Sequence, residues 1–131
     1  MSEGGQERSL PEQPGGMLTQ ISNEVVRTLK ESYGKGPDRA KAYLLDDVLL
    51  IVMRGGATTV EQTLLEAGEG DLVRNYRQVY QNHMGDRLIG IVERATGRKV
   101  ATYQSQVLFW PFTSIEVFLF AEGENGAILR S

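Results

Sequence analysis

The sequence predicts an α+β fold of two layers, a four-stranded and mainly antiparallel sheet with helices on one face. Apolar residues recur at helical spacing in two long segments, residues 18–33 and 71–96. Two strand-like segments follow the first of these helices, and two more follow the second. With a short helix between, the order is α-β-β-α-α-β-β. Two hairpins separated by helices are typical of one sheet that the helices cover from one side.

The first expected helix ends at Gly34. Leu18, Ile21, Val25 and Leu29 recur at helical spacing and form its apolar face. Gly34 follows the last turn of this pattern, and glycine readily takes the left-handed backbone that ends many helices.

The first hairpin is expected from residues 41–45 and 48–53, with Asp46 and Asp47 forming the tight turn between them. Every residue from 48 to 53 is apolar. A strand with one face in water would alternate instead. The sequence therefore predicts that this second strand is central and covered on both faces.

Two helices are expected next. The shorter one begins at Thr58, because Thr58 and Glu61 have the spacing of a capping box, and ends at Gly68. The longer one has Asp71 as its expected N-cap and ends at Gly97. Its apolar stripe is predicted to consist of Leu72, Tyr76, Val79, Tyr80, Leu88 and Ile91.

Residues 98–105 and 114–121 are the last two expected strands. Side chains alternate along a strand, so Phe118 and Phe120 share one face of the sheet and Val117 lies on the other. We expect the two phenylalanines to lie on the face that the helices leave free.

The folded domain is predicted to span residues 17–122, between a disordered leader and a flexible tail. Residues 1–16 contain four glycines, two prolines and one large aliphatic side chain, Leu10. This apolar surface is too small to offset the entropy lost on ordering. The leader also lacks the apolar segment of a secretory signal. Residues 123–131 open with turn-forming residues and are expected to be flexible.

Composition excludes several classes of function. The chain has no cysteine and one histidine, His83, which removes thiolate nucleophiles, disulfides and multi-histidine metal sites. The net charge of −3 opposes broad nucleic-acid binding. No apolar run approaches the ~18 residues of a membrane-spanning helix. Asp46 and Asp47 are adjacent, so their side chains diverge rather than face each other as a catalytic pair. We expect no catalytic residues, no metal and no cofactor.

The segment from residue 107 to 112 is apolar and aromatic, and its Pro111 excludes a regular central strand. Two interpretations remain open: the segment folds back as a lid on the core, or it docks a second subunit or a partner. Aromatic residues on a helix-free sheet face favour a homodimer. The predicted interaction surface consists of Val107, Leu108, Phe109, Trp110, Phe112, Phe118 and Phe120.

A second candidate site is the turn between residue 54 and residue 58. Backbone N–H groups of Gly55 and Gly56, the positive end of the following helix at Thr58 and the guanidinium of Arg54 are suited to a small anion. The alternative is a tight strand-to-helix turn with a solvated arginine.

Six short blocks follow one another along the chain: ISNEVV (21–26), YGKGP (33–37), RGG (54–56), TLLEAG (63–68), TGRKV (96–100) and IEVF (115–118). Together they resemble the MpsC-type domain family, named after a component of a bacterial Na⁺-translocating system that generates membrane potential. The likeness extends over nearly all of residues 17–121. Two departures are the Thr58-Thr59 pair, where the family pattern usually has Thr-Pro, and the apolar segment 107–112, where the last connection is normally polar.

The resemblance implies a small bacterial cytoplasmic protein, linked in some cases to ion or bicarbonate uptake, and brings no catalytic residues. The leading hypothesis is a non-catalytic accessory or regulatory domain, a homodimer that contacts a protein partner at a membrane transport system. The alternatives are an anion or metabolite sensor at the turn from Arg54 to Thr58 and an RNA-binding module. The RNA-binding module would have to use the basic cluster of Arg74, Arg77, Arg87, Arg94 and Arg98.

Overall fold

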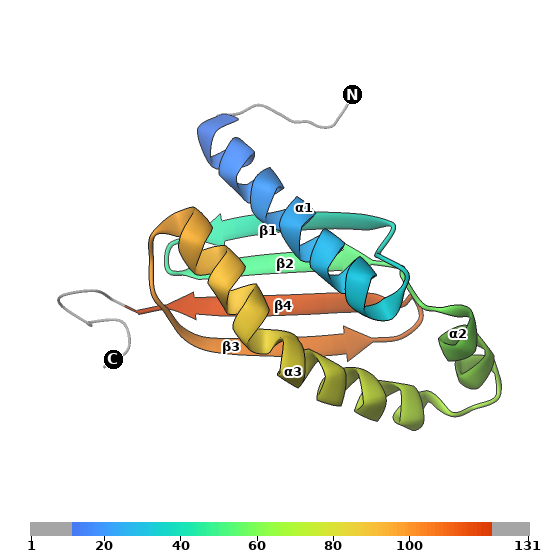
Figure 1. Ribbon diagram of the computed structural model, residues 1–131. Coiled ribbons are helices and arrows are strands. Elements are labelled where there is room, and N and C mark those ends of the chain that lie inside the picture. Colours follow the sequence, from blue (N-terminus) through green and yellow to red (C-terminus); the bar gives the residue numbers. More distant parts are fainter. Residues whose placement is uncertain (1–11, 122–131) are drawn as a thin grey trace.

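The computed structural model describes residues 12–121, and their order of elements is the predicted one, α-β-β-α-α-β-β (Figure 1). The α+β prediction is confirmed. The elements are α1 (Glu12–Tyr33), β1 (Arg39–Leu45), β2 (Val48–Arg54), α2 (Thr59–Glu66), α3 (Gly70–Thr96), β3 (Val100–Leu108) and β4 (Thr113–Phe120).

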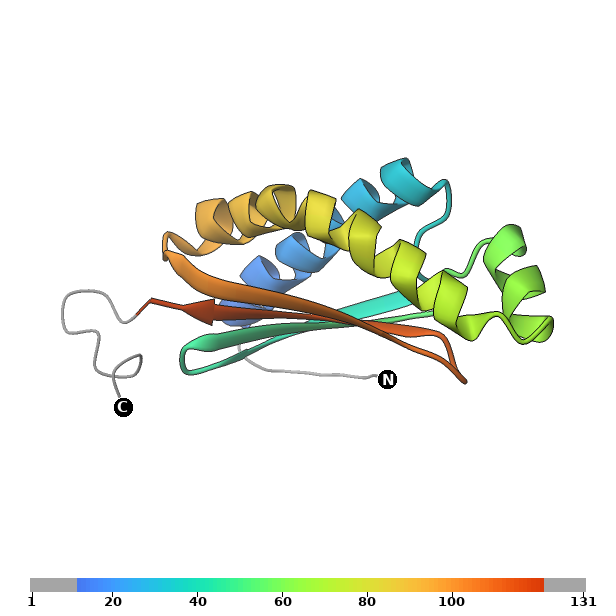
Figure 2. The same ribbon diagram turned by 90° about the horizontal axis from the view of Figure 1, so that it is seen from below.

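The four strands form one antiparallel sheet in the order β1-β2-β4-β3, so the two hairpins meet at their second strands. Helices α1 and α3 lie across one face of this sheet, and α2 lies beyond its end (Figures 1 and 2). The predicted placement of helices on one face is confirmed.

The core lies between the sheet and the two long helices. Residues at alternate positions of β2 and β4 point into it, together with one face of α1 and the C-terminal half of α3. The buried cluster contains Ile21, Val25, Leu29, Ala42, Leu49, Ile51, Met53, Met84, Leu88, Ile91, Val92, Phe118 and Phe120.

The face predicted for Phe118 and Phe120 was wrong. Both side chains are fully buried beneath the helices, while Val117 and its neighbours on alternate positions lie on the other face. Alternation groups side chains by face but does not say which group meets the helices. Here the larger rings fill the space under α1 and α3, where their burial removes the most apolar surface from water.

Strand β2 is central, as predicted, but helices cover only one of its faces. Leu49, Ile51 and Met53 are buried under the helices, and the intervening residues are half-buried. Among residues 12–121, no helix packs on the face that carries Leu50. The unbroken apolar run therefore supplies the core on one side and an apolar surface on the other.

Some element boundaries differ from the prediction. Helix α1 begins at Glu12, so residues 12–16, assigned to the leader, are helical. Pro14 is compatible with this because the first N–H groups of a helix have no intrahelical acceptor. Helix α3 begins at Gly70 with Glu69 as N-cap, and Asp71 lies in its first turn instead. The rest of the predicted leader and the predicted tail lie outside the described residues.

The assignment of faces can be tested with two adjacent leucines of β2. Leu49→Ala is expected to lower the free energy of unfolding by about 2–5 kcal/mol, because it opens a cavity in the core. Leu50→Ala, on the half-buried face, is expected to lower the free energy of unfolding by a clearly smaller amount. Urea denaturation at a concentration where the chain is monomeric measures both, and equal losses would contradict the assignment.

Candidate functional site

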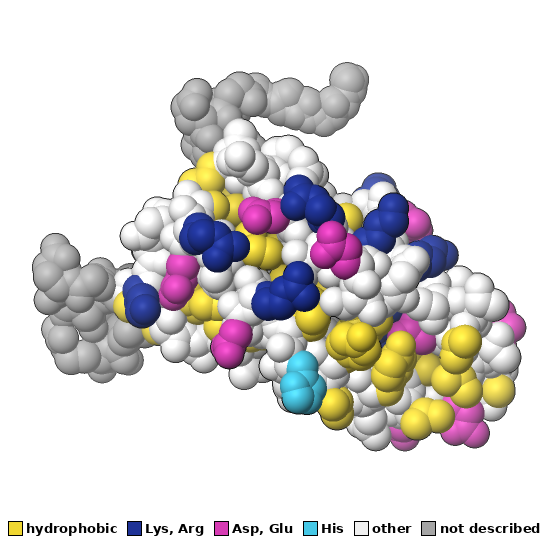
Figure 3. Space-filling view, in the orientation of Figure 1, with side chains coloured by type: hydrophobic (Ala, Val, Ile, Leu, Met, Phe, Trp, Pro, Cys, Tyr) yellow, Lys and Arg dark blue, Asp and Glu magenta, His cyan; other side chains and the backbone are white. Residues whose placement is uncertain are grey.

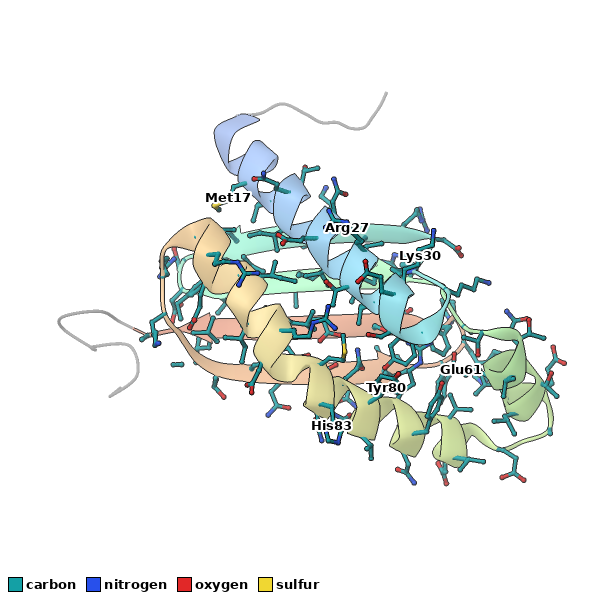
Figure 4. All side chains as sticks on the ribbon, viewed as in Figure 1. Met17, Arg27, Lys30, Glu61, Tyr80 and His83 are labelled. Carbon is teal, nitrogen blue, oxygen red and sulfur yellow. The ribbon has the colours of Figure 1, made fainter. Side chains whose placement is uncertain are left out.

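A buried ion pair joins α2 to α3. The guanidinium of Arg77 donates two hydrogen bonds to the Glu61 carboxylate, from Nε to Oε2 and from Nη2 to Oε1, each 2.6 Å long. Its Nη2 also donates to the carbonyl of Gly56 at 3.2 Å. Both side chains are buried, with Arg77 only 4% exposed and Glu61 not exposed at all. Figure 4 shows Glu61 at the junction of α2 and the N-terminal half of α3.

The predicted capping box is confirmed and fixes the carboxylate of this pair. The Thr58 hydroxyl accepts from the Glu61 N–H at 3.2 Å, and the Thr58 N–H donates to Glu61 Oε1 at 2.8 Å. Burial by itself would raise the pKa of Glu61, but the hydrogen bonds from Arg77 and Thr58 outweigh it and lower that pKa below 4.5. The carboxylate therefore stays ionised at neutral pH.

Aromatic rings enclose the guanidinium. Its central carbon lies 3.9 Å from the ring centroid of Tyr33, the last residue of α1, and 4.9 Å from that of Phe112, just before β4. Cation–π contacts of this kind are strongest away from water. Arg77 thus holds α1, α2, α3 and the connection between β3 and β4 together at one point.

A second buried carboxyl lies in the middle of the sheet. Glu116 of β4 has no exposed surface and accepts hydrogen bonds from the Tyr103 hydroxyl at 2.5 Å, from Ser105 Oγ at 3.0 Å and from Gln81 Nε2 at 3.0 Å. Burial raises the pKa of Glu116 to about 7, although the three hydrogen bonds act in the opposite direction. Burial, with the Glu116 charge next in effect, also raises the pKa of Tyr103.

We call Glu61, Arg77, Gln81, Tyr103, Ser105 and Glu116 the buried polar cluster. Sequence reasoning missed it, because the apolar stripe predicted for the long helix contains neither Arg77 nor Gln81. The signal in the sequence that could have revealed the cluster is the spacing of residues along α3. Val73, Arg77, Gln81, Met84 and Leu88 follow one another at intervals of three or four residues, so they share one face of α3.

The cluster determines how α3 is rotated. Since Arg77 and Gln81 face the core, the apolar residues beside them in the N-terminal half of the helix face solvent. The predicted apolar stripe was therefore wrong for its first four members, and only its last two, Leu88 and Ile91, are buried. Leu72, Tyr76, Val79 and Tyr80 are all exposed.

The structure does not bring the predicted anion-binding residues together. Arg54 lines a groove on the helix-free face of the sheet with Arg39 and Lys41. The Thr58 hydroxyl is used by the capping box, and the positive end of α2 already faces the carboxylate of Glu61.

Gly55 and Gly56 lie where segments of the chain pass close to one another, rather than in an open concave site for an anion. Their φ angles are +80° and +94°, and a Cβ on Gly55 would lie 2.1 Å from the carboxylate of Asp38. The Gly55 N–H donates to the carbonyl of Phe112 at 2.8 Å. A pocket of about 310 Å³ opens beside this turn and is bordered by Trp110.

Part of the aromatic segment 107–112 packs against the rest of the chain, as the lid interpretation predicts, and part of it is exposed, as the docking interpretation predicts. Val107 is buried, and Phe109 packs against the Phe112 ring at 5.7 Å and under the Arg74 guanidinium at 4.7 Å. Leu108 is exposed, and Trp110 is 72% exposed. With Phe118 and Phe120 in the core, only Leu108 and Trp110 of the predicted interaction surface are exposed.

The helix-free face of the sheet carries a continuous apolar surface, which we call the open sheet face. Three register rows cross it from β1 to β3. In these rows the two middle strands contribute only apolar residues, while β1 adds a lysine, a tyrosine and a leucine and β3 adds polar side chains. The rows are Lys41-Val52-Ile115-Gln106, Tyr43-Leu50-Val117-Gln104 and Leu45-Val48-Leu119-Thr102.

The five arginines predicted as an RNA-binding cluster do not form a free basic patch. Each has a partner within the chain, and cations and anions alternate over α1 and the C-terminal half of α3 (Figure 3). The partners are Asp71 for Arg74, Glu61 for Arg77, Glu31 for Arg87, Glu24 for Arg94 and the Asp46 carbonyl for Arg98.

Within residues 12–121, no group of three or more histidine or acidic side chains is arranged to hold a metal ion. In that same stretch, no helix has both the length and the apolar character needed to cross a membrane.

Arg77→Met is expected to lower the free energy of unfolding by about 3–5 kcal/mol, because it leaves the Glu61 carboxylate buried without its counter-charge. Arg74→Met is the matched control one turn earlier; its pair with exposed Asp71 is expected to contribute less than about 1 kcal/mol. The double variant Glu61→Gln/Arg77→Met should recover part of the loss. Chemical denaturation measures all three, and equal costs at residues 74 and 77 would refute the role of the buried pair.

The raised pKa of Glu116 makes stability depend on pH. Between pH 4.5 and about 7, the folded chain keeps a proton that the unfolded chain has released, so stability falls as the pH rises through this range. Glu61, whose pKa is lowered, acts in the opposite sense and only below pH 4.5. In urea denaturation at a series of pH values, Glu116→Gln should flatten this slope. An unchanged slope would show that Glu116 is not its source.

Comparison with protein families gives a match, over residues 14–122, to the family described as Na⁺-translocating membrane potential-generating system (MpsC). No curated protein and no solved structure matches the chain. The match covers the described fold from the first turn of α1 to the end of β4, and with it the buried polar cluster and the open sheet face. The chain is therefore a member of the MpsC family.

Proposed function

We propose that the chain is a non-catalytic cytoplasmic accessory domain that forms a homodimer through its open sheet face and acts by contact with other proteins. The observation that carries this proposal is the pair of apolar strands at the centre of that face. Val48, Leu50 and Val52 lie beside Ile115, Val117 and Leu119, with no helix of the described chain over them.

The distribution of charge on the face supports pairing with a second copy. Its cations lie on the β1–β2 hairpin, with Arg39 and Lys41 on the edge strand and Arg54 at the end of β2. Its amides lie on the opposite edge strand, on Gln104 and Gln106. A two-fold axis parallel to the strands would lay the β1 edge of one copy over the β3 edge of its partner. The apolar strands would then meet each other, and Arg39 and Lys41 of β1 would meet neutral side chains of β3 rather than other cations.

The two buried carboxyls support the non-catalytic part of the proposal. A general acid or base must reach its substrate within hydrogen-bond distance. Glu61 is committed to Arg77 and Thr58, and Glu116 is enclosed by side chains from β3 and α3. Both carboxyls therefore serve the fold.

The name of the family supports a place beside a membrane system that translocates ions. A link to bicarbonate uptake is a further part of the proposal. An accessory role at such a system requires a surface that can bind another protein. The exposed side chains of Leu108 and Trp110, at the end of the β3–β4 hairpin, add apolar area that such a partner could contact. Anion sensing at the turn from Arg54 to Thr58 is less favoured, because Glu61 already occupies the positive end of α2.

The dimer can be tested with two valine-to-lysine variants on opposite sides of the molecule. Val117→Lys places a charge at the centre of the open sheet face, whereas Val79→Lys places the same charge on the exposed side of α3. In light scattering coupled to size exclusion, the wild type and Val79→Lys should have twice the chain mass of 14.5 kDa. Val117→Lys should have the mass of a single chain.

Circular dichroism confirms that each variant is folded before its mass is interpreted. A monomeric wild type at high concentration would contradict the proposal. So would a dimer that persists in folded Val117→Lys.

A further inference from the structure

A groove lies at one corner of the open sheet face, where β1 begins and β2 ends (Figure 1). Its volume of about 370 Å³ is within the range of small-molecule sites. We call it the cationic groove, because three of the six residues that line it are basic and none is acidic. The six are Arg39, Lys41, Arg54, Ala40, Tyr43 and Val52.

No carboxylate on the open sheet face balances these cations. A fourth register row, Arg39-Arg54-Thr113-Leu108, crosses the face beside the three rows described above, and none of the four rows holds an aspartate or a glutamate. Asp38 precedes the first cation, but its carboxylate lies against Gly55 in the separate pocket that Trp110 borders. None of the three cations forms an ion pair with a carboxylate of the described residues.

Two of the cations lie directly opposite each other. Arg39 and Arg54 are register partners in neighbouring antiparallel strands, and both side chains are exposed on the same face. Like charges at such positions destabilise a sheet. Lys41 adds a third positive charge, and its ammonium lies 5.3 Å from the ring centroid of Tyr43. An anion bound among the three would offset their mutual repulsion, so the free groove favours binding.

The donors of the cationic groove match a phosphate monoester. Each guanidinium presents a planar fork of N–H donors that fits two phosphate oxygens, and a lysine adds a compact charge. A phosphate monoester has three terminal oxygens and a charge of about −1.5 to −2 at neutral pH, so it can meet all three cations at once. Tyr43 and Val52 form an uncharged wall beside the cations, against which the organic part of such a ligand can lie.

We propose that the cationic groove binds a phosphate monoester, with Arg39, Lys41 and Arg54 on the phosphate and Tyr43 and Val52 against the organic group. The groove is complete within one chain and lies at the rim of the open sheet face, so the proposal does not rest on the homodimer. Soluble phosphorylated molecules and the headgroup of phosphatidic acid share this chemistry, and the experiment distinguishes these two sources.

The probe is phenyl phosphate, and its twin is phenyl sulfate, which has a similar shape and a single charge. Isothermal titration calorimetry at low salt and about pH 8 should show saturable binding of phenyl phosphate, roughly tenfold tighter than that of its twin, because its second charge faces several cations. At about pH 5 most of this preference should disappear, since the second phosphate pKa is about 6. The sulfate does not titrate in this range and therefore reports any change in the protein itself.

Three variants locate the binding. Arg39→Gln/Arg54→Gln should weaken the binding of phenyl phosphate roughly tenfold, as two lost ion pairs imply. Arg87→Gln/Arg94→Gln is the matched control. It changes the net charge equally, at arginines on α3 that already have carboxylate partners, and should leave the binding unchanged. Tyr43→Ser should weaken the binding of phenyl phosphate but not that of inorganic phosphate. Circular dichroism again verifies that each variant is folded.

A second arm of the experiment identifies the source of the phosphate. The chain is sedimented with phosphatidylcholine vesicles that contain either phosphatidic acid, a monoester, or phosphatidylglycerol, a diester. Sedimentation with phosphatidic acid that Arg39→Gln/Arg54→Gln loses would assign the groove to a lipid headgroup. Binding of phenyl phosphate without such sedimentation would assign it to a soluble ligand.

Several outcomes would overturn the proposal. Failure to bind both phenyl phosphate and phosphatidic acid vesicles would do so, as would equal binding of phenyl phosphate and phenyl sulfate. Equal weakening by the two arginine double variants would show an effect of net charge alone. Equal sedimentation with phosphatidic acid and phosphatidylglycerol would likewise show attraction to negative charge rather than recognition of a monoester.

Discussion

Glu61 and Arg77 meet at the point where four segments of the chain converge, and the orientation of those segments depends on this contact. Removing both charges from water is costly, and the cost is offset only because the carboxylate and the guanidinium each find several partners within hydrogen-bond distance. Such a pair tolerates little change in geometry. It fixes α2 against α3 and sets the rotation of α3 about its own axis.

That rotation accounts for both the interior and the surface of the N-terminal half of α3. Gln81 lies one turn after Arg77 on the same face, so the rotation that satisfies Glu61 also brings Gln81 to Glu116 in the sheet. The side chains displaced from the core by these two polar residues are Leu72, Tyr76 and Val79, which face solvent. From Met84 onward, the same face of the helix is apolar and packs in the ordinary way.

The sequence was sufficient for the class of fold, the hairpin at Asp46 and Asp47 and the capping box at Thr58, because each depends on local chemistry. It was insufficient wherever the outcome depends on pairing between distant residues. Hydrophobic periodicity places Arg77 in water, and only Glu61, in another helix, makes its burial favourable. Alternation likewise separated Phe118 from Val117 without deciding which of the two the helices would cover.

The rotation of α3 can be measured with adjacent single cysteines, since the chain has none of its own. In Leu72→Cys the thiol should react with a soluble disulfide reagent at close to the rate of a free thiol. In Val73→Cys it should be protected until the chain unfolds, because Val73 has no exposed surface. A protected thiol at residue 72 together with a reactive one at residue 73 would show that the apolar side of the helix faces inward and would contradict the account.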